Sequence, residues 1–412
     1  MIDDMNAGVV IVGAGLAGVS AATGLRQRGF DRPITLISEE LALPYDRPPL
    51  SKELLCGDRS VADITLHDAE YYEEQRIAIK SGLRVCGIDR EACTLRLEGG
   101  QTLSYSHLIF ATGARPRHLP VPLGSAPLTR LFYLRELGDA MALREHLAHD
   151  RHVLVVGAGF IGLEVAASAR RLGCRVTVLE SGPRVIERAA PPEVSAFVQQ
   201  VHQENGVEFR FGAQVLDVLE QPGSISVHLA SGETLTADAV LVGIGVIPND
   251  ALAREAGLMC DNGIVVDQHC CSTDPRIFAI GDVAKPFNPF FARHVRLEHW
   301  ESARQTGEIA AATICGEQAV NAGVPWVWSD QYHLNIQFLG WSDPRSEKVL
   351  RGEIGGASWS LIEVLDKRVI GAVLINAGRE RRPIERLIMS RHVVDMERLA
   401  DTDVALKKWV PA

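Results

Sequence analysis

The chain has 412 residues, of which 46% are apolar and 23% charged, and its formal net charge at pH 7 is −10. This length predicts two or three domains and this composition is typical of a globular enzyme, while the acidic balance argues against a nucleic-acid partner. No run of about eighteen apolar residues occurs, and the opening "MIDDMNAG" is acidic where a signal peptide is basic, which predicts a cytoplasmic protein without membrane association.

Residues 9–40 have the pattern of a dinucleotide-binding unit. The apolar run "VVIV" leads into Gly13, Gly15 and Gly18, followed by a helical pattern, a second strand and Glu39. In such a unit the first glycine permits a tight turn, the second lets the backbone approach a pyrophosphate, and the third lets helix pack on strand. The helix N-terminus favours the phosphate charge, and Glu39 can accept from a ribose hydroxyl.

The same pattern returns at residues 155–184, with Gly157, Gly159 and Gly162 in the corresponding places and Glu180 as the acid. A carboxylate at Glu180 would repel a 2′-phosphate and favours NADH over NADPH, although Arg184 leaves NADPH open. The alternative is that one copy is an ordinary strand–helix–strand unit whose glycines serve packing alone.

A second repeat indicates how the two units are connected. "HLIFATGARP" (107–116) and "AVLVGIGVIP" (239–248) are both apolar strands that end in a glycine, and the second fingerprint lies between them. We interpret Gly113 and Gly245 as the points where the chain leaves the first domain and returns. The prediction is an α/β fold with two nested Rossmann-like dinucleotide-binding domains, residues 1–113 with 245–321 and residues 114–244.

The return segment "TDPRIFAIGDVA" (273–284) predicts a strand that delivers Gly281 and Asp282 to a helix start. Asp282 there can bind a sugar-alcohol hydroxyl, or can simply cap the helix. From about residue 322 the pattern changes to alternating strands, with a turn at 366–368, and ends in a basic helix within 378–391. Residues 322–412 are therefore expected to form a C-terminal α+β domain.

The eight cysteines show no CxxC or CxxxxC spacing and no Cys/His cluster at metal-ligand spacing. We expect no metal site and expect most cysteines to be buried apolar fillers. The pair His294 and His299 is interpreted as coincidence.

Two nested nucleotide folds with Asp282 on the return resemble the two-dinucleotide-binding flavoproteins that include glutathione reductase. The stretches "LPYDRPPLSK" (43–52) and "PWVWSDQ" (325–331) make the sharper match. They resemble the oxygenase-coupled NADH:ferredoxin reductases, in particular the reductase components of aromatic-ring dioxygenases of the biphenyl and phenylpropanoate type. In that family the first fold holds FAD and the second NADH.

The resemblance implies two sets of cofactor residues. FAD is expected at the first glycine turn and at Ala17, Glu39, Arg47, Lys52, Val85, Thr112, Gly113, Arg135, Asp282 and Trp300. NADH is expected at Gly157, Gly159, Phe160, Ile161, Gly162, Glu164, Glu180 and Gly245. On their own, Arg47 and Lys52 can also be solvated loop cations, and Phe160 can be a packing aromatic.

The resemblance also implies three residues close to the chemistry. Lys52 is expected beside the flavin, in an ion pair with Glu164, and Trp328 near the flavin on the path to the ferredoxin. The alternative for Trp328 is a core or interface tryptophan. Arg379, Arg381, Arg382 and Arg386 are candidates for docking an acidic ferredoxin, against the alternative of a solvated helix end.

The function implied is a relay in which NADH reduces FAD and FAD passes single electrons to a [2Fe–2S] ferredoxin that serves an aromatic-ring dioxygenase. One rival is a disulfide or peroxide reductase on the same fold, which needs a reactive cysteine at the flavin, with Cys56 as the nearest candidate. The other rival is a flavin-based redox sensor with little turnover.

Overall fold

The computed structural model describes residues 7–122 and 128–409. Contacts between Cα atoms divide the chain into two compact units. The first comprises residues up to Asp46, Val61–Arg115 and Ile247–Gly323, and the second comprises Arg47–Ser60, Pro116–Val246 and the chain from Val324 on. The chain thus changes unit close to Gly113 and close to Gly245, where the strands β8 (Ala114–Pro116) and β17 (Val246–Pro248) lie.

The first unit is built on a five-stranded sheet in the order β19-β7-β1-β2-β3, and every pairing in it is parallel. Most residues of its strands are buried and apolar, as expected where helices cover a parallel sheet. The strands are β1 (Val9–Val12), β2 (Ile34–Ile37), β3 (Ile77–Lys80), β7 (His107–Phe110) and β19 (Ile277–Ala279).

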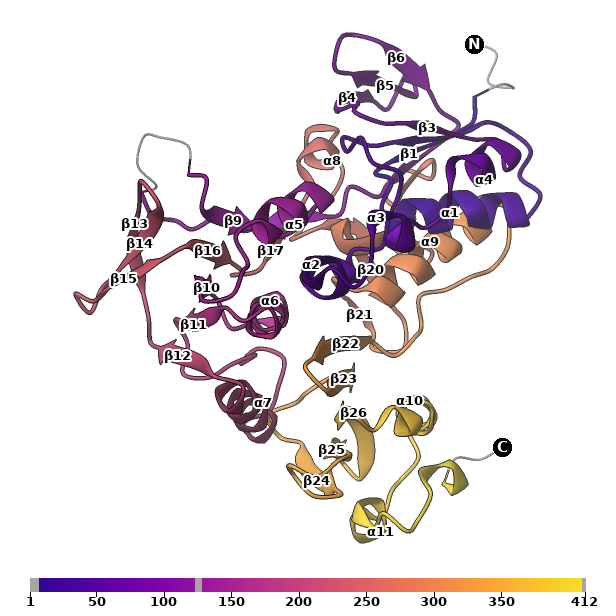
Figure 1. The fold of residues 1–412 in the computed structure, drawn as a ribbon. Coiled ribbons are helices and arrows are strands. Elements are labelled where there is room, and N and C mark those ends of the chain that lie inside the picture. The colour runs from indigo at the N-terminus through magenta and orange to yellow at the C-terminus, as the bar shows by residue number, and fades with distance from the viewer. Residues whose placement is uncertain (1–6, 123–127, 410–412) are drawn as a thin grey trace. The chain divides into compact units, whose positions relative to one another are not determined.

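Helices α1 (Leu16–Gln27) and α9 (Trp300–Ile314) lie side by side in this unit (Figure 1). Small residues permit the close approach, since a Cβ added to Gly307 would lie 2.6 Å from the carbonyl oxygen of Ala17. The smaller elements of the unit are α3 (Val61–Ile64), α4 (Ala69–Glu74), β4 (Val85–Asp89), β5 (Thr94–Leu97), β6 (Thr102–Ser104), α8 (Ala251–Glu255), β18 (Ile264–Val266), η2 (Gly281–Val283), β20 (Ala284–Asn288) and β21 (Arg293–His294).

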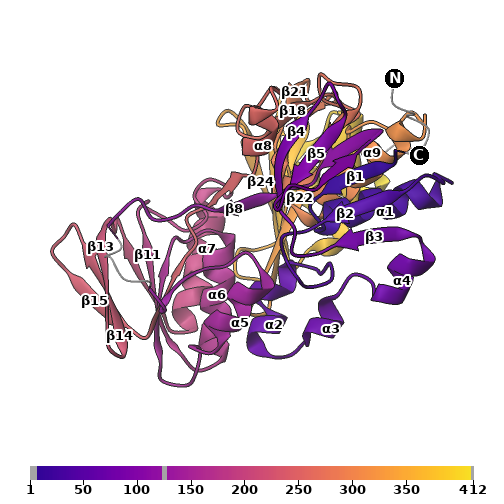
Figure 2. The ribbon, with the colours of Figure 1, turned by 90° about the horizontal axis from the view of Figure 1, so that it is seen from above.

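The second unit contains another five-stranded parallel sheet, in the order β12-β11-β10-β16-β9. Figure 2 shows helix α6 (Phe160–Arg171) lying along this sheet. The strands are β9 (Leu131–Tyr133), β10 (His152–Val156), β11 (Arg175–Glu180), β12 (Val207–Phe211) and β16 (Ala239–Val242). The accompanying elements are η1 (Pro48–Ser51), α2 (Glu53–Cys56), α5 (Leu137–Arg144), α7 (Pro192–Glu204), β13 (Val215–Gln221), β14 (Ser224–Leu229) and β15 (Thr234–Ala237).

The C-terminal part of the second unit is an antiparallel sheet in the order β22-β23-β26-β25-β24, as the alternating pattern predicts. Its elements are β22 (Trp326–Gln331), β23 (Leu334–Gly340), β24 (Glu347–Arg351), β25 (Trp359–Leu365), β26 (Arg368–Ile375), η3 (Gly378–Glu380), α10 (Arg381–Ser390), α11 (Met396–Ala400) and η4 (Leu406–Lys408). Residues 366–367 form the expected turn, and α10 is the expected basic helix. The α/β fold with two Rossmann-like sheets and a C-terminal α+β part is confirmed.

Candidate functional site: two glycine turns and a buried ion pair

The first glycine turn leaves open space where a cofactor phosphate is expected. A Cβ added to Gly13 would lie 2.1 Å from the Ala111 carbonyl oxygen, and one added to Gly18 would lie 2.1 Å from that of Gly13. A Cβ on Gly15, by contrast, would meet nothing within 4 Å. The outer glycines are therefore required by the turn itself, whereas Gly15 presents bare backbone at the N-terminus of α1, which fits a dinucleotide pyrophosphate.

Other predicted FAD residues of this unit lie at the ends of strands. Glu39 follows β2, and its largely exposed side chain lies 3.6 Å from the guanidinium of Arg84. Val85 begins β4 and is buried. The hydroxyl of Thr112 donates to the carbonyl of Asn249 (2.8 Å), whose backbone N–H donates to the carbonyl of Gly113 (2.9 Å). Asn249 was not foreseen, because no motif marks it.

The segment around Asp282 differs from the prediction. Gly281 and Asp282 lie in a three-residue 3₁₀ helix that runs directly into strand β20, and no long helix begins there. The long helix α9 begins at Trp300, whose indole N–H donates to a carboxylate oxygen of Asp46 (2.8 Å). A Cβ on Gly281 would lie 2.9 Å from that of Ala17, which explains why both residues are small.

The second glycine turn repeats the geometry of the first. Added Cβ atoms on Gly157 and Gly162 would lie 2.5 and 2.1 Å from backbone oxygens, whereas the nearest atom to a Cβ on Gly159 is 3.9 Å away. The carboxylate of Glu180, at the end of β11, accepts from the backbone N–H groups of Ala158 and Gly182, both at 2.7 Å. Glu180 thus stabilises the turn, and its carboxylate lies where it could accept a hydrogen bond from a ribose hydroxyl of the cofactor.

Three further predicted NADH residues lie near this turn. The ring of Phe160 packs edge-on against Phe338, with the centroids 5.3 Å apart, so the packing alternative holds for at least part of this side chain. Ile161 is exposed at 44% of its surface. Gly245 has φ 104°, and Arg188 is the nearest neighbour of its hypothetical Cβ, at 3.6 Å.

The ion pair expected between Lys52 and Glu164 is confirmed. The amine of Lys52 lies 3.6 Å from Glu164 Oε1 and 3.8 Å from a carboxylate oxygen of Asp330. Glu164 also accepts from the hydroxyls of Ser51 (2.5 Å) and Ser329 (2.7 Å). Burial raises the pKa of Glu164, while the charge of Lys52 and the two hydroxyls act in the opposite direction.

The loop "DRPPL" holds the two predicted cations of the second unit in place. Two prolines begin the 3₁₀ helix η1, which fixes the backbone between Arg47 and Lys52. The guanidinium of Arg47 donates to the backbone carbonyl of Arg135. Both arginines of the predicted FAD set are thus brought together, and the solvated-loop alternative does not describe Arg47.

Trp328 lies in a stack on the C-terminal sheet. Its ring lies parallel to that of Trp326, with the centroids 4.9 Å apart, and the guanidinium of Arg381 covers the Trp326 ring at 3.9 Å. Of the other arginines predicted for docking, Arg379, Arg382 and Arg386 are exposed. Trp326 was missed as a candidate, although its spacing of two residues from Trp328 on a strand signals a shared face.

The cysteine prediction is wrong in part. Cys174 and Cys270 are buried, but the other six cysteines are only half-buried. All eight are free thiols. Among the described residues no group of three or more His, Cys, Asp or Glu side chains is placed to hold a metal ion.

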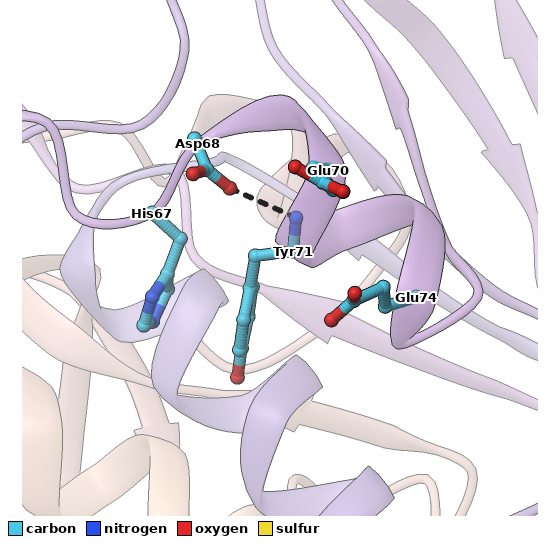
Figure 3. Close-up of a pocket in the computed structure, with 5 residues that line it drawn as sticks. All are labelled: His67, Asp68, Glu70, Tyr71 and Glu74. Atoms are coloured by element: carbon cyan, nitrogen blue, oxygen red, sulfur yellow. Dashed lines mark hydrogen bonds between the residues drawn. The ribbon is translucent and has the colours of Figure 1, made fainter.

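A shallow pocket on the first unit is separate from the predicted site residues (Figure 3). It is lined by His67, Asp68, Glu70, Tyr71 and Glu74. Asp68 caps helix α4 by accepting from the backbone N–H of Tyr71 (2.9 Å), and the His67 and Tyr71 rings stack at 3.8 Å. These local contacts explain why the side chains of Asp68, His67 and Tyr71 lie where they do.

Across the described ranges, no helix combines the length and the apolar character needed to cross a membrane.

Comparison with known proteins gives matches along most of the chain. The family model of the pyridine nucleotide-disulphide oxidoreductases matches residues 7–307, and that of the reductase C-terminal domain matches residues 326–410.

Curated relatives and solved structures agree with these family matches. The chain is 42% identical over 402 residues to the ferredoxin–NAD(+) reductase component of the anthranilate 1,2-dioxygenase system of Burkholderia cepacia, covering 97% of this chain and 98% of the relative. It is 40% identical over 400 residues to rhodocoxin reductase of Rhodococcus erythropolis (97% and 93% covered). The reductase in a covalent putidaredoxin reductase–putidaredoxin complex superposes with a TM-score of 0.94 at 37% identity, covering 98% of both chains. The chain therefore belongs to the pyridine nucleotide-disulphide oxidoreductase family and carries the reductase C-terminal domain.

Proposed function

We propose that this protein is an FAD-dependent NADH:ferredoxin oxidoreductase that delivers electrons to a [2Fe–2S] ferredoxin serving an aromatic-ring dioxygenase. The observation that carries the proposal is the pair of glycine turns, each with open space at its middle glycine, one on each parallel sheet. Two such turns support two dinucleotides, a donor and an acceptor of electrons. The names of the relatives, reductases of ferredoxin-type proteins, support the acceptor.

Within the proposal, FAD binds the first turn and NADH the second. Residues 1–113 with 245–321 form the FAD domain, 114–244 the NADH domain and 322–412 the C-terminal domain. Bound FAD supplies the chemistry that converts a hydride from NADH into single electrons for the ferredoxin. Because NADH is the donor, we place the enzyme in the cytoplasm.

The chain's own residues bind and orient the two nucleotides. The bare backbone at Gly15 and Gly159 receives the pyrophosphates, and Glu180 meets the ribose of NADH. The amine of Lys52, held by Glu164 and Asp330, places a fixed positive charge, which stabilises negative charge that develops next to it. Arg47 and Arg135 are assigned to FAD because the resemblance implies both residues and because the two are in contact with each other.

Electron exit is assigned to the tryptophan stack. Trp328 and Trp326 lie on one face of β22, and Arg381 on helix α10 covers the outer ring. Helix α10 and the segment before it also present Arg379, Arg382 and Arg386, which supply the positive charge for an acidic ferredoxin.

An anaerobic titration with NADH, followed by oxidised [2Fe–2S] ferredoxin, tests the proposal. We expect two electrons taken up per flavin and reoxidation by the ferredoxin, because all eight cysteines are free. Four electrons per flavin would indicate a redox-active cysteine pair and a disulfide reductase. A reduced flavin that does not react with ferredoxin would indicate a sensor. The variant Cys56→Ser should leave NADH-dependent turnover unchanged.

A further inference from the structure

Strand β22 has two faces with different chemistry. Successive side chains of a strand point to opposite sides, so Trp326, Trp328 and Asp330 share one face while Ser329 and Gln331 share the other. The first face carries the tryptophan stack and the contact to Lys52. On the second face Ser329 and Gln331 are buried, exposed at only 0% and 1%. A polar pair so completely buried needs partners.

The partners form a continuous chain of hydrogen bonds from helix α6 to helix α7. The hydroxyl of Ser329 donates to Glu164 Oε1 (2.7 Å), and Nε2 of Gln331 donates to the Ser329 oxygen (3.0 Å). Oε1 of Gln331 lies 2.8 Å from Nε2 of His202, which is fully buried on α7. Glu164 on the second fingerprint helix is thereby connected to a histidine remote in sequence.

The donor and acceptor roles along this chain of hydrogen bonds are fixed in one direction. Since Gln331 donates through its nitrogen to Ser329, its oxygen must accept, and His202 must carry its proton on Nε2. Nδ1 of His202 then accepts from the hydroxyl of Tyr332, at 3.3 Å. With its oxygen occupied by the Gln331 amide, the Ser329 hydroxyl has its hydrogen directed at Glu164. An amide does not relay protons as a hydroxyl does, so this chain orients groups.

We propose that Gln331 and His202 are positioning residues, which hold the Ser329 hydroxyl as a donor to Glu164 and so keep the carboxylate charged and facing Lys52 while NADH reacts. The statement about the reaction of NADH rests on the function proposed above. A buried polar chain of this kind contributes less to stability than apolar packing of the same volume would, which favours a positioning role.

Two charged groups act on Glu164 from the elements packed against it. Lys52, next to η1, favours the charged carboxylate, and Asp330 on β22 disfavours it. The hydroxyls of Ser51 and Ser329 favour the charged form as well. Loss of the Ser329 donor therefore shifts the balance toward the protonated carboxyl.

The experiment compares Gln331→Leu and His202→Phe with His202→Gln, which keeps an N–H donor near the position of Nε2. Ser226→Ala is the matched control, since it removes another buried hydroxyl of the second unit, bonded to Thr236 (3.0 Å). The first readout is the carboxyl ¹³C resonance of Glu164 in holoenzyme labelled at glutamate, identified by its absence in Glu164→Gln. The second is the pH profile of hydride transfer from NADH, measured by anaerobic stopped flow.

We expect the titration midpoint of Glu164 to rise by about one pH unit in Gln331→Leu and His202→Phe, with His202→Gln and Ser226→Ala close to wild type. The pH profile of hydride transfer should move by the same amount, which lowers the rate about fivefold relative to wild type at one unit below the new midpoint. A purely structural role would lower the melting temperature of the variants without moving either profile.

Three results would overturn the inference. One is an unchanged Glu164 midpoint in the folded Gln331→Leu and His202→Phe proteins, and another is a shifted midpoint with an unchanged hydride-transfer profile. The third needs no disruptive variant: ¹⁵N-histidine spectra of the wild type that show His202 protonated on Nδ1. Failure of the proposed function itself would appear separately, as wild-type enzyme that does not reduce ferredoxin with NADH, and the carboxyl titration then decides the positioning role alone.

Discussion

The amine of Lys52 lies 3.6 Å from the carboxylate of Glu164, and the two side chains are exposed at 13% and 6%. Breaking a buried pair leaves one charge without compensation, which costs about 3 to 5 kcal/mol. Since Asp330 remains 3.8 Å from Lys52, we expect Glu164→Gln to lower the free energy of unfolding by about 3 kcal/mol, the lower end of that range.

Denaturant unfolding of the holoenzyme measures this loss. The control is Asp58→Asn, which breaks the more exposed pair with Arg171 (2.5 Å) and should cost less than about 1 kcal/mol. Equal losses in the two variants would show that burial of the Lys52 pair has no energetic consequence.

Substitutions in the first glycine turn should affect folding and cofactor binding separately. Gly15→Ala places its Cβ in open space, so the protein should fold normally yet lose FAD, because the methyl group occupies the approach of the pyrophosphate. Gly13→Ala, by contrast, places its Cβ 2.1 Å from a backbone oxygen at φ 113° and should fail to fold. Flavin absorbance per protein and circular dichroism distinguish the two.

The second turn offers the same comparison for the nicotinamide nucleotide. Gly159→Ala should raise KM for NADH about tenfold or more while the protein still folds and holds its flavin, because the nearest atom to the new Cβ is 3.9 Å away. Gly162→Ala, whose Cβ would lie 2.1 Å from a backbone oxygen, should be unstable. If Gly159→Ala binds NADH as well as wild type, this turn does not receive the pyrophosphate.

Much of this architecture could be predicted because its signals are local. The glycine spacing requires the two turns, and the alternation of apolar and polar residues at the start of β23 predicts a strand. The segment around Asp282 was predicted less well: Gly281 and Asp282 look like a helix start, yet the chain forms a 3₁₀ turn and continues as β20. The packing of the Gly281 backbone against Ala17 is a contact between distant segments, which the local pattern does not show.

Contacts between distant segments were the least predictable part. The Lys52–Glu164 pair was expected from the resemblance, since nothing in either local sequence identifies its partner. The bond between His202 and Gln331 joins residues on α7 and β22 that share no motif. The hydrogen bond between Thr112 and Asn249 is another contact that no motif indicates. Such pairs depend on the folded arrangement of whole elements, which residue patterns along the chain do not specify.

The arginines of α10 predict a salt-dependent docking surface. Arg381→Glu with Arg382→Glu should raise KM for ferredoxin about tenfold and flatten its dependence on ionic strength, while NADH-to-flavin transfer stays as in wild type. Arg345→Glu is the matched control, because Arg345 is an exposed arginine of the same C-terminal part that pairs locally with Asp343 (2.8 Å). Unchanged KM and unchanged salt dependence in the double variant would remove this surface from the proposal.

Burial of His202 predicts a specific loss of stability in acid. Desolvation lowers the pKa of His202 from its ordinary 6.5 to about 4, so the folded protein resists a proton that the unfolded chain accepts. As the pH falls from 6.5 to 4 the unfolded state gains this proton first, and the free energy of unfolding decreases by about 3 kcal/mol on account of His202. His299, whose burial also lowers its pKa to about 4, acts in the same window.

Urea unfolding at a series of pH values checks this contribution. His202→Gln should show a shallower decrease between pH 6.5 and 4 than wild type, by about 3 kcal/mol over the window, because glutamine does not titrate. A His202→Gln curve parallel to wild type would mean that His202 takes up its proton equally in both states, which contradicts a fully buried, neutral imidazole bonded to Gln331.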